Sequence, residues 1–389
     1  MRVNRGGQLA PEDIFGRDGF IEDLWRELEQ VSVVLTAERR TGKTCVIKKM
    51  HANPPAGTLT FFQDLEGIYS AVELVEAVIR CIQPALSRRE RARTGFKQFL
   101  DSIGGIEVAG VLRLPEAAHP EWKHLLTRVV ENLLEHHPGP VIFFWDEFPQ
   151  MLHNVAQDEP GDAMAMLDFL RTLRQEHPHI RFVLTGSIGF HSVLAYLQRR
   201  GYRNAPKNDM YTALLPPLTE PDAIELARAL MHGEGIRVED TQAETVATET
   251  AAEAGNIPFY IHQIVGGMRG RAHVGPGTAR AIVDEGLRAP HDPWELRHYR
   301  TRIDHDYEAD AAIYALAVLD TLGASETPLT FAELAARAKA RPGVTDDEQL
   351  HGVLKHLEQD HYIARSAETG RYAFRTSLIG RWWRMEREL

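Results

Sequence analysis

The stretch VSVVLTAERRTGKTCVIKKM, residues 31–50, is the part of the sequence that most strongly indicates the fold. Its β-branched beginning predicts a buried strand, and its end has apolar residues at helical spacing. The loop between them closes with Gly42, Lys43 and Thr44. A loop between a buried strand and a helix directs backbone N–H groups and the positive end of the helix at one position, which suits phosphate oxygens. The stretch therefore predicts a phosphate-binding loop.

This loop follows the pattern GxxxxGK[ST] closely, and that pattern binds nucleoside triphosphates. The lysine of the pattern reaches the β- and γ-phosphates, and the hydroxyl that follows it ligates Mg2+. We therefore expect ATP and Mg2+ as ligands, with Lys43 contacting the phosphates, where it also serves catalysis, and Thr44 contacting the metal. The residues expected to bind the nucleotide are Arg39, Arg40, Thr41, Gly42, Lys43, Thr44 and Cys45.

Ala37 stands where the pattern has its first glycine. Since alanine is the smallest replacement available, we expect the loop to bind phosphate. The rate of hydrolysis stays open, because the loop departs from the pattern at this position.

Two carboxylates follow the next strongly apolar segment. Val141–Trp145 is fully apolar and runs into Asp146 and Glu147, and parallel α/β sheets place their ligands at the carboxyl ends of their strands. We expect Asp146 to hold magnesium, directly or through water. Glu147 is expected to be catalytic and to polarise the attacking water, since phosphoryl transfer depends on positioning and electrostatic stabilisation.

The polar sequence Thr185-Gly186-Ser187 follows another predicted strand at 180–184. We expect the small hydroxyl side chain of Ser187 to contact the γ-phosphate and to take part in catalysis. The alternative is that Ser187 is a turn residue that caps the helix beginning near Phe190.

Strands and helices alternate through the first part of the chain. Strands are predicted at 31–36, 58–62, 141–145 and 180–184, and helices at 45–50, 71–86, 121–136 and 162–176. This alternation predicts an α/β fold with a parallel, doubly wound sheet. We interpret a basic stretch at 88–97 and a glycine-flanked hairpin at 106–114 as an insertion.

Helical patterns follow the predicted sheet. They extend over 217–289 with a break at 255–258, and a long helical connector is expected over 294–322. Helices at 330–340 and 346–359, followed by short alternating segments at 362–364 and 372–374, predict a winged helix. The expected domains are therefore an α/β core at 1–216, a helical lid at 217–290, and a connector with a winged helix at 291–389.

Composition limits the compartment and the kind of partner. The formal net charge of −11 disfavours non-specific coating of nucleic acid by the whole surface. Cys45 and Cys81 are the only cysteines, too few for a disulfide framework, and they indicate a reducing compartment. No apolar run is long enough to span a bilayer, and the N-terminus lacks the apolar core of a signal peptide. We expect a cytoplasmic protein without membrane contact.

The C-terminal stretch is basic within this acidic chain. Its arginines are Arg365, Arg371, Arg375, Arg381, Arg384 and Arg387. A winged helix with a basic end is suited to contact the phosphates of double-stranded DNA. The alternative is a protein-interaction or packing module in which Trp382 and Trp383 are anchors in a core or an interface.

Taken in order, these motifs resemble those of AAA+ P-loop ATPases, and within them the archaeal-type ATPase group near the STAND and origin-recognition families. The segments that carry the resemblance are IFGR (14–17), RRTGKT (39–44), DEF (146–148), LTGS (184–187), LPPL (215–218) and GNIPFY (255–260). The resemblance implies an α/β core, a helical lid and a winged helix. It also implies that Gly16 and Arg17 lie beside the adenine and that Pro258 closes the nucleotide pocket from the lid.

Members of that group often carry an arginine that completes a nucleotide site, either their own or a neighbour's. Arg199, Arg200 and Arg203 are available in the corresponding stretch, but the usual Gly-Arg context is missing. No arginine finger is therefore assigned.

We expect an ATP-hydrolysing switch that couples its nucleotide state to DNA or to a protein partner, which includes self-association. An alternative is a nucleotide-locked DNA-binding or signalling module with little turnover, which Ala37 and the missing Gly-Arg context favour. A third hypothesis, a small-molecule kinase, accounts only for the N-terminal half of the chain.

Overall fold

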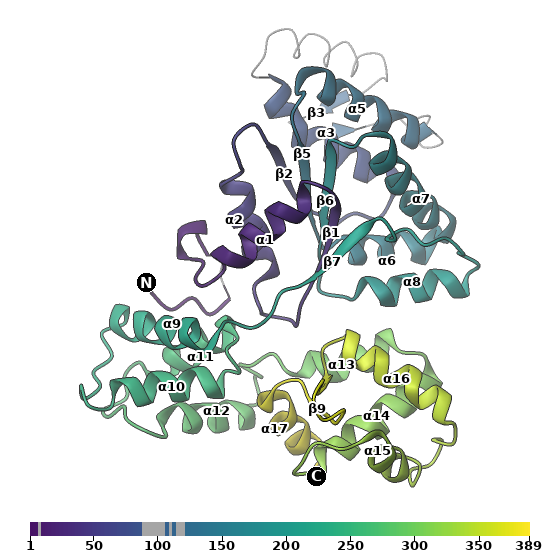
Figure 1. Cartoon of the computed structure of the whole chain (residues 1–389). Coiled ribbons are helices and arrows are strands. Elements are labelled where there is room, and N and C mark those ends of the chain that lie inside the picture. The colour runs from purple at the N-terminus through teal and green to yellow at the C-terminus, as the bar shows by residue number, and fades with distance from the viewer. Residues whose placement is uncertain (7–8, 88–105, 109–110, 114–120) are drawn as a thin grey trace. The chain divides into compact units, whose positions relative to one another are not determined.

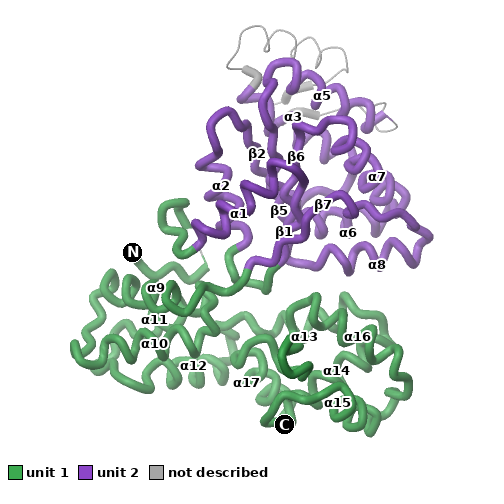
Figure 2. Tube along the Cα trace, viewed as in Figure 1, with its two compact units in different colours: residues 1–16, 37–42, 216–389 green, residues 17–36, 43–215 purple. Residues whose placement is uncertain are grey.

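The computed structural model describes residues 1–6, 9–87, 106–108, 111–113 and 121–389. The chain divides into two compact units, which Figure 2 distinguishes by colour. The sheet unit comprises Arg17–Thr36 and Lys43–Leu215, and the helical unit comprises Met1–Gly16, Ala37–Gly42 and Pro216–Leu389. The basic stretch expected at 88–97 lies outside the described residues. The three expected domains, with boundaries at 216 and 290, stay a prediction.

A five-stranded parallel sheet forms the centre of the sheet unit (Figure 1). In spatial order its strands are β2 (Leu59–Asp64), β5 (Val141–Asp146), β6 (Ile180–Leu184), β1 (Ser32–Thr36) and β7 (Met210–Leu214). The sequence predicts four of these strands to within two residues. It does not predict β7, because this edge strand has only one buried side chain and therefore no apolar run.

Helices cover both faces of this sheet. They are α1 (Asp18–Leu28), α2 (Lys43–Ala52), α3 (Ala71–Ser87), α5 (Trp122–His136), α6 (Phe148–Asp158), α7 (Pro160–Glu176) and α8 (Phe190–Arg199). Successive side chains of a strand point to opposite faces. Phe143 of β5 therefore belongs to the core shared with α3 and α5–α8, whereas Phe144 meets Trp25 of α1 edge to face, with ring centroids 6.1 Å apart. The doubly wound α/β fold is thus confirmed.

A short hairpin lies in the segment that we interpret as an insertion. Strands β3 (Ile106–Val108) and β4 (Val111–Arg113) pair antiparallel. This pairing confirms the hairpin expected at 106–114.

The helical unit begins with a group of four helices after the sheet. They are α9 (Glu220–Gly233), α10 (Ala243–Glu253), α11 (Pro258–Met268) and α12 (Thr278–Arg288). Thr219 caps α9, because its hydroxyl accepts a hydrogen bond from the backbone N–H of Asp222 at 3.3 Å. The expected break falls between α10 and α11, and Pro258 starts α11 at a position where a missing N–H costs nothing.

Five further helices and a hairpin complete this unit. They are α13 (Arg297–Asp306), α14 (Ala309–Gly323), α15 (Phe331–Ala338), α16 (Asp347–Gln359), β8 (Ile363–Arg365), β9 (Tyr372–Phe374) and α17 (Ser377–Glu386). Thr330 and Glu333 form a reciprocal capping box at the start of α15. The order of helices and hairpin expected over 330–374 is therefore present, and α17 is an addition that the sequence does not predict.

The expectation of one long helix over 294–322 is wrong. The segment forms α13 and α14, which are separated at Tyr307 and Glu308, both with extended backbone. The hydroxyl of Tyr307 donates to Asp360 Oδ2 at 2.7 Å, and this contact holds the chain at the break. Helical periodicity continues across the break because both helices bury one face, so periodicity alone does not reveal it.

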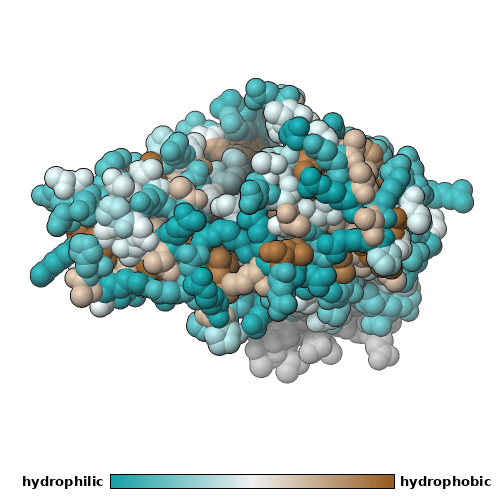
Figure 3. All heavy atoms as spheres, turned by 90° about the horizontal axis from the view of Figure 1, so that it is seen from below, coloured by the Kyte–Doolittle hydropathy of each residue, from teal (hydrophilic) through white to brown (hydrophobic). Residues whose placement is uncertain are grey.

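The surface is mixed rather than dominated by one character. On the face drawn in Figure 3, apolar residues form small areas separated by hydrophilic ones. Scattered exposed apolar side chains of this kind are normal for globular proteins. No helix in the described part of the chain is long and apolar enough to cross a membrane.

Candidate functional site

Two of the expected metal ligands are in direct contact. Thr44 lies in the first turn of α2, and its hydroxyl donates to Asp146 Oδ2 at 2.6 Å. Asp146 is the last residue of β5 and is 96% buried, with 4% of its surface exposed. The sequence separates these residues by 102 positions, and the parallel sheet brings them together.

The environment of Asp146 favours a bound cation. Burial raises the pKa of Asp146, the Thr44 hydrogen bond opposes this shift, and the neighbouring Glu147 charge adds to it. A cation beside this carboxylate would relieve the cost of its burial. A hydroxyl and a carboxylate oxygen are also the donors that Mg2+ prefers, and Mg2+ takes only one or two protein carboxylates in nucleotide sites. The residues present therefore fit magnesium.

Glu147 is held in place by Ser187, which follows the neighbouring strand β6. Its Oε2 accepts hydrogen bonds from the backbone N–H of Ser187 at 2.8 Å and from the Ser187 hydroxyl at 2.7 Å. Its backbone is left-handed, with φ 54° and ψ 28°, which is uncommon for a residue other than glycine and occurs often at functional sites. The structure therefore brings two of the three expected catalytic residues, Glu147 and Ser187, into contact.

Gly186 allows this contact because a side chain would not fit at its position. A Cβ there would lie 2.8 Å from Pro149 Cδ and 3.3 Å from Glu147 Oε2. The N-cap of α8 is Gly189, and no side chain caps this helix. Ser187 therefore does not act as the cap that the alternative interpretation requires.

Two residues at this edge of the sheet were not assigned a role from the sequence. Asp64 ends β2 and is in register with Asp146 on the neighbouring strand. Thr185 is 2% exposed, and its hydroxyl has no hydrogen-bond partner within the described ranges. The pattern of polar residues directly after a buried strand marks both of them, as it marks Asp146 and Ser187.

The remaining residues of the sheet unit are placed by α1 and α2. Lys43 is the first residue of α2, and burial raises the pKa of the neighbouring Cys45 thiol, which keeps it protonated. Arg17 precedes α1 and is 4% exposed.

Arg200 lies over the ring of Tyr196, 3.5 Å from its centroid, so this arginine already has a local partner. The arginine finger stays unassigned.

The first part of the phosphate loop, Ala37–Gly42, belongs to the helical unit. Ala37 does not occur among the described residues with positive φ, so the loop does not require glycine conformation at this position. Arg40 does adopt positive φ, at 67°. Arg39 and Arg40 both pair with Glu295, and Thr41 is 1% exposed. Replacement of the first glycine is thus compatible with the observed backbone.

Gly16 and Pro258 also belong to the helical unit. Gly16 has φ 61°, and a Cβ there would lie 2.9 Å from the Cβ of Asp222, so only glycine allows the chain to pass α9 this closely. Pro258 begins α11. Their expected contacts with the nucleotide stay predictions.

The basic C-terminal end is largely bound internally. Arg381 pairs with Glu253 and Asp284, Arg387 pairs with Asp320, and Arg384 donates to the Gly323 carbonyl oxygen at 2.8 Å. Trp382 and Trp383 are 4% and 0% exposed. These observations favour the packing role for the two tryptophans and leave fewer arginines for a DNA contact.

Several histidine and aspartate residues lie close together in the sequence near 291–306. Within the described ranges, no group of three or more His, Cys, Asp or Glu side chains is arranged to hold a metal ion. Asp292 instead caps α13, because its two carboxylate oxygens accept hydrogen bonds from the backbone N–H groups of Leu296 and Arg297 at 3.0 and 2.9 Å.

Comparisons with known proteins place this geometry in a known fold. The sequence matches no family model, and no curated protein matches it. The structure is similar to a Walker-type ATPase of Pyrococcus abyssi, with a TM-score of 0.64 and 15% identity over 98% of this chain and 99% of that one. It is also similar to the ORC2 protein of Aeropyrum pernix in ADPNP–ADP complexes, with a TM-score of 0.56 and 13% identity over 99% and 98% of the two chains.

At these identities the similarity establishes the fold alone. The chain has the fold of these two structures, with a parallel sheet and following helices, over nearly its whole length. The α/β P-loop fold with a C-terminal helical region, which is part of what the sequence resemblance implies, is therefore confirmed, and the winged helix stays a prediction.

Proposed function

We propose that this protein binds ATP with Mg2+ and hydrolyses it to ADP and phosphate. The observation that carries the proposal is the contact between Thr44 and Asp146, at 2.6 Å, beside a Glu147 carboxylate that Ser187 holds in place. The fold supports a nucleotide as the ligand, and the similar ORC2 protein was solved with ADPNP and ADP.

Each residue has a defined role in this proposal. Lys43 contacts the β- and γ-phosphates, and the loop residues Arg39, Arg40, Thr41, Gly42, Thr44 and Cys45 surround them. Thr44 and Asp146 would hold magnesium. When bound, the metal supplies positive charge that offsets the charge developing on the phosphate oxygens. Gly16 and Arg17 would lie beside the adenine, and Pro258 would close the site from the helical lid.

Glu147 would orient and polarise the attacking water. The carboxylate is fixed by two hydrogen bonds to one oxygen, Oε2, so Oε1 is the atom that would accept the water proton. Ser187 positions this carboxylate and would contact the γ-phosphate. Phosphoryl transfer requires little more from a protein than such positioning and electrostatic support.

In this proposal the C-terminal region couples nucleotide binding and hydrolysis to a partner. In this proposal the α/β core, the lid and the winged helix act as a switch that responds to nucleotide and acts on double-stranded DNA, on a protein partner or on another copy of the chain. The internal pairing of Arg381, Arg384 and Arg387 supports a protein partner over DNA. Duplex binding across a salt series, with and without ATP, separates these partners, because phosphate contacts weaken steeply with salt.

Steady-state phosphate release tests the hydrolytic assignment. We expect Glu147→Gln to lower the rate by about a hundredfold or more while ATP binding persists, because the variant keeps the shape of the side chain and loses its basicity. Equal rates from the two proteins would reject the assignment.

A second candidate is a module that retains nucleotide with little turnover. The engagement of Glu147 Oε2 by both donors of Ser187 favours it, because this oxygen already accepts two hydrogen bonds and only Oε1 is left to contact an attacking water. The nucleotide content of the purified protein distinguishes the two functions. Stoichiometric bound ATP after prolonged incubation with Mg2+ would support the second candidate.

A further inference from the structure

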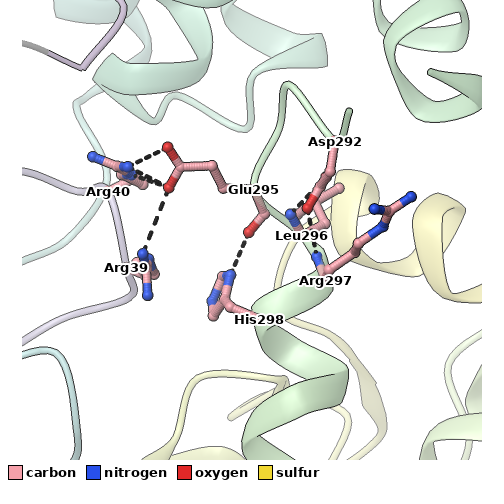
Figure 4. Close-up of polar contacts among 7 residues, drawn as sticks. All are labelled: Arg39, Arg40, Asp292, Glu295, Leu296, Arg297 and His298. Atoms are coloured by element: carbon pink, nitrogen blue, oxygen red, sulfur yellow. Dashed lines mark hydrogen bonds and ion pairs between the residues drawn. The ribbon is translucent and has the colours of Figure 1, made fainter. Parts of the chain in front are cut away.

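The Arg40 side chain lies between an anion and an aromatic ring. Its Nε donates to Glu295 Oε2 at 2.8 Å, and its Nη2 donates to the same carboxylate (Figure 4). On another side, the guanidinium carbon lies 4.5 Å from the ring centroid of Phe259, the residue after Pro258. All these residues belong to the helical unit.

Arg39 takes part in the same contact. Its Nη2 lies 3.6 Å from Glu295 Oε2, so one carboxylate is shared by two neighbouring guanidinium groups (Figure 4). Burial by itself would raise the pKa of Glu295, but the hydrogen bonds and charge of Arg40, with the charge of Arg39, lower it below its usual range. Glu295 is therefore ionised at neutral pH.

Hydrogen bonds on both sides of Glu295 hold its backbone in place. The Asp292 carboxylate accepts hydrogen bonds from the backbone N–H groups of Leu296 and Arg297, which directly follow Glu295. The ring of His298 donates from Nδ1 to the Glu295 carbonyl oxygen. Burial lowers the pKa of His298 to about 4, so its ring is neutral at pH 7 and keeps this single donor role. Glu295 itself has positive φ, at 54°. These local contacts fix the backbone around Glu295, so its carboxylate is oriented toward the loop.

The same two arginines lie three and four positions before Lys43 in the phosphate loop. A guanidinium fork binds carboxylate and phosphate with the same bidentate geometry. A carboxylate bound to such a guanidinium group occupies the position that two phosphate oxygens would take. A triphosphate, which carries more negative charge than a carboxylate, can therefore compete with it for the guanidinium group.

We propose that the guanidinium groups of Arg39 and Arg40 form an anion subsite that Glu295 fills in the nucleotide-free protein and that a phosphate group of a bound nucleoside triphosphate takes over. The proposal rests on the proposed nucleotide function. It adds a role for the arginine side chains and makes Glu295 an internal competitor of the ligand.

A chain of hydrogen bonds connects the segment around Glu295 with the C-terminal hairpin. Tyr299, in the first turn of α13, donates to Glu38 Oε1 of the loop at 3.1 Å. Tyr362, at the start of the hairpin segment, donates to the Tyr299 carbonyl oxygen at 2.8 Å. The loop, α13 and the hairpin are therefore joined by consecutive buried hydrogen bonds, and a change at Glu295 reaches the base of α13 first.

Titration of the full-length protein with Mg-ATP and Mg-ADP tests the subsite. We expect Glu295→Gln to bind Mg-ATP about threefold to fivefold more tightly than the wild type, the effect expected from loss of one competing, partly exposed carboxylate. A gain of affinity does not arise from misfolding. Asp304→Asn is the matched control, because it removes one exposed charge from the same helix and should leave the affinity unchanged.

A second set of variants checks that Arg40 transmits the effect. Arg40→Ala should weaken Mg-ATP binding, and adding Glu295→Gln to it should give a smaller gain than in the wild type, because only the Arg39 pair with Glu295 is then left to lose. Wild-type protein that binds no Mg-ATP would reject the proposed function itself. Wild-type protein that binds Mg-ATP, with Glu295→Gln binding equally or more weakly, would overturn the subsite alone.

Discussion

Ser187 donates two hydrogen bonds to one oxygen of Glu147, from its backbone N–H at 2.8 Å and from its hydroxyl at 2.7 Å. The two residues lie just after neighbouring strands of the sheet, β5 and β6, and Glu147 has a left-handed backbone conformation. The contact fixes the direction of the carboxylate and lowers its freedom to rotate. Any base that Glu147 provides is therefore positioned by Ser187.

Ser187→Ala removes the hydroxyl bond and keeps the backbone bond. A hydrogen bond to a charged group is worth about 1.5 to 3 kcal/mol, and Glu147 is partly exposed, so we expect kcat for ATP hydrolysis to fall about tenfold. KM should change less than kcat, because the hydroxyl orients a catalytic group and provides only one of several proposed contacts to the phosphates.

Ser187→Thr is the control for this variant, since it keeps the hydroxyl and should restore most of the rate. A Ser187→Ala protein with unchanged kcat would show that the side chain does not position Glu147.

Gly186→Ala tests the close approach that this geometry requires. The added Cβ would lie 2.8 Å from Pro149 Cδ and near Glu147 Oε2. Overpacking of this kind costs about 1 to 3 kcal/mol, so we expect a lower thermal midpoint together with reduced phosphate release.

Gly161→Ala is its matched control, because nothing lies within 4 Å of a Cβ at that position near the start of α7. That variant should unfold at the same temperature as the wild type or slightly higher. Equal stability of both variants would contradict the packing argument.

Asp320→Asn tests the anchor of α17. Asp320 of α14 is 2% exposed and accepts hydrogen bonds from Trp383, Arg387 and Arg341. Removing its charge leaves the arginines without their anion, and we expect the free energy of unfolding to fall by about 2 to 3 kcal/mol.

Urea denaturation measures this change. Asp310→Asn, on the same helix but exposed, should alter the midpoint by only a few tenths of a kcal/mol. A similar small effect at Asp320 would mean that α17 is held mainly by its apolar contacts.

Acid should destabilise the protein partly through His262. Burial lowers the pKa of His262 to about 4, and its Nδ1 accepts a hydrogen bond from the backbone N–H of Asn4 at 3.0 Å. The unfolded chain binds a proton at a higher pH than the folded chain, so this stability is present above about pH 6.5 and is lost as the pH falls toward 4.

Thermal midpoints of the wild type and of His262→Gln, measured from pH 7 to pH 5, should converge as the pH falls. His298 adds a similar dependence, because its pKa is lowered to about 4 as well. His305→Gln, which alters an exposed histidine, should follow the wild-type curve. Parallel curves for wild type and His262→Gln would refute the assignment.

The strands and the polar residues after them were predictable because both depend on local sequence. Buried strands β1, β2, β5 and β6 have apolar or β-branched runs, and their carboxyl ends carry residues that can bind a ligand. The contact between Thr44 and Asp146 follows from the rule that parallel strands present these ends at one edge. Strand β7 escaped prediction because an exposed edge strand has no apolar run. Helix α17 does bury residues at helical spacing, Leu378, Ile379, Trp382 and Trp383, so its pattern is present in the sequence although the expected elements end at 374.

The phosphate loop at 37–44 shows what local sequence determines and what depends on the tertiary structure. The sequence by itself determined the α/β fold, the loop at 37–44 and the carboxylates at 146 and 147, because each depends on the order and spacing of neighbouring residues. Only the tertiary structure decided that Arg40 faces Glu295, 255 positions away, and that Ser187 holds Glu147. Such pairings depend on how distant segments meet in space, and no local pattern encodes that meeting.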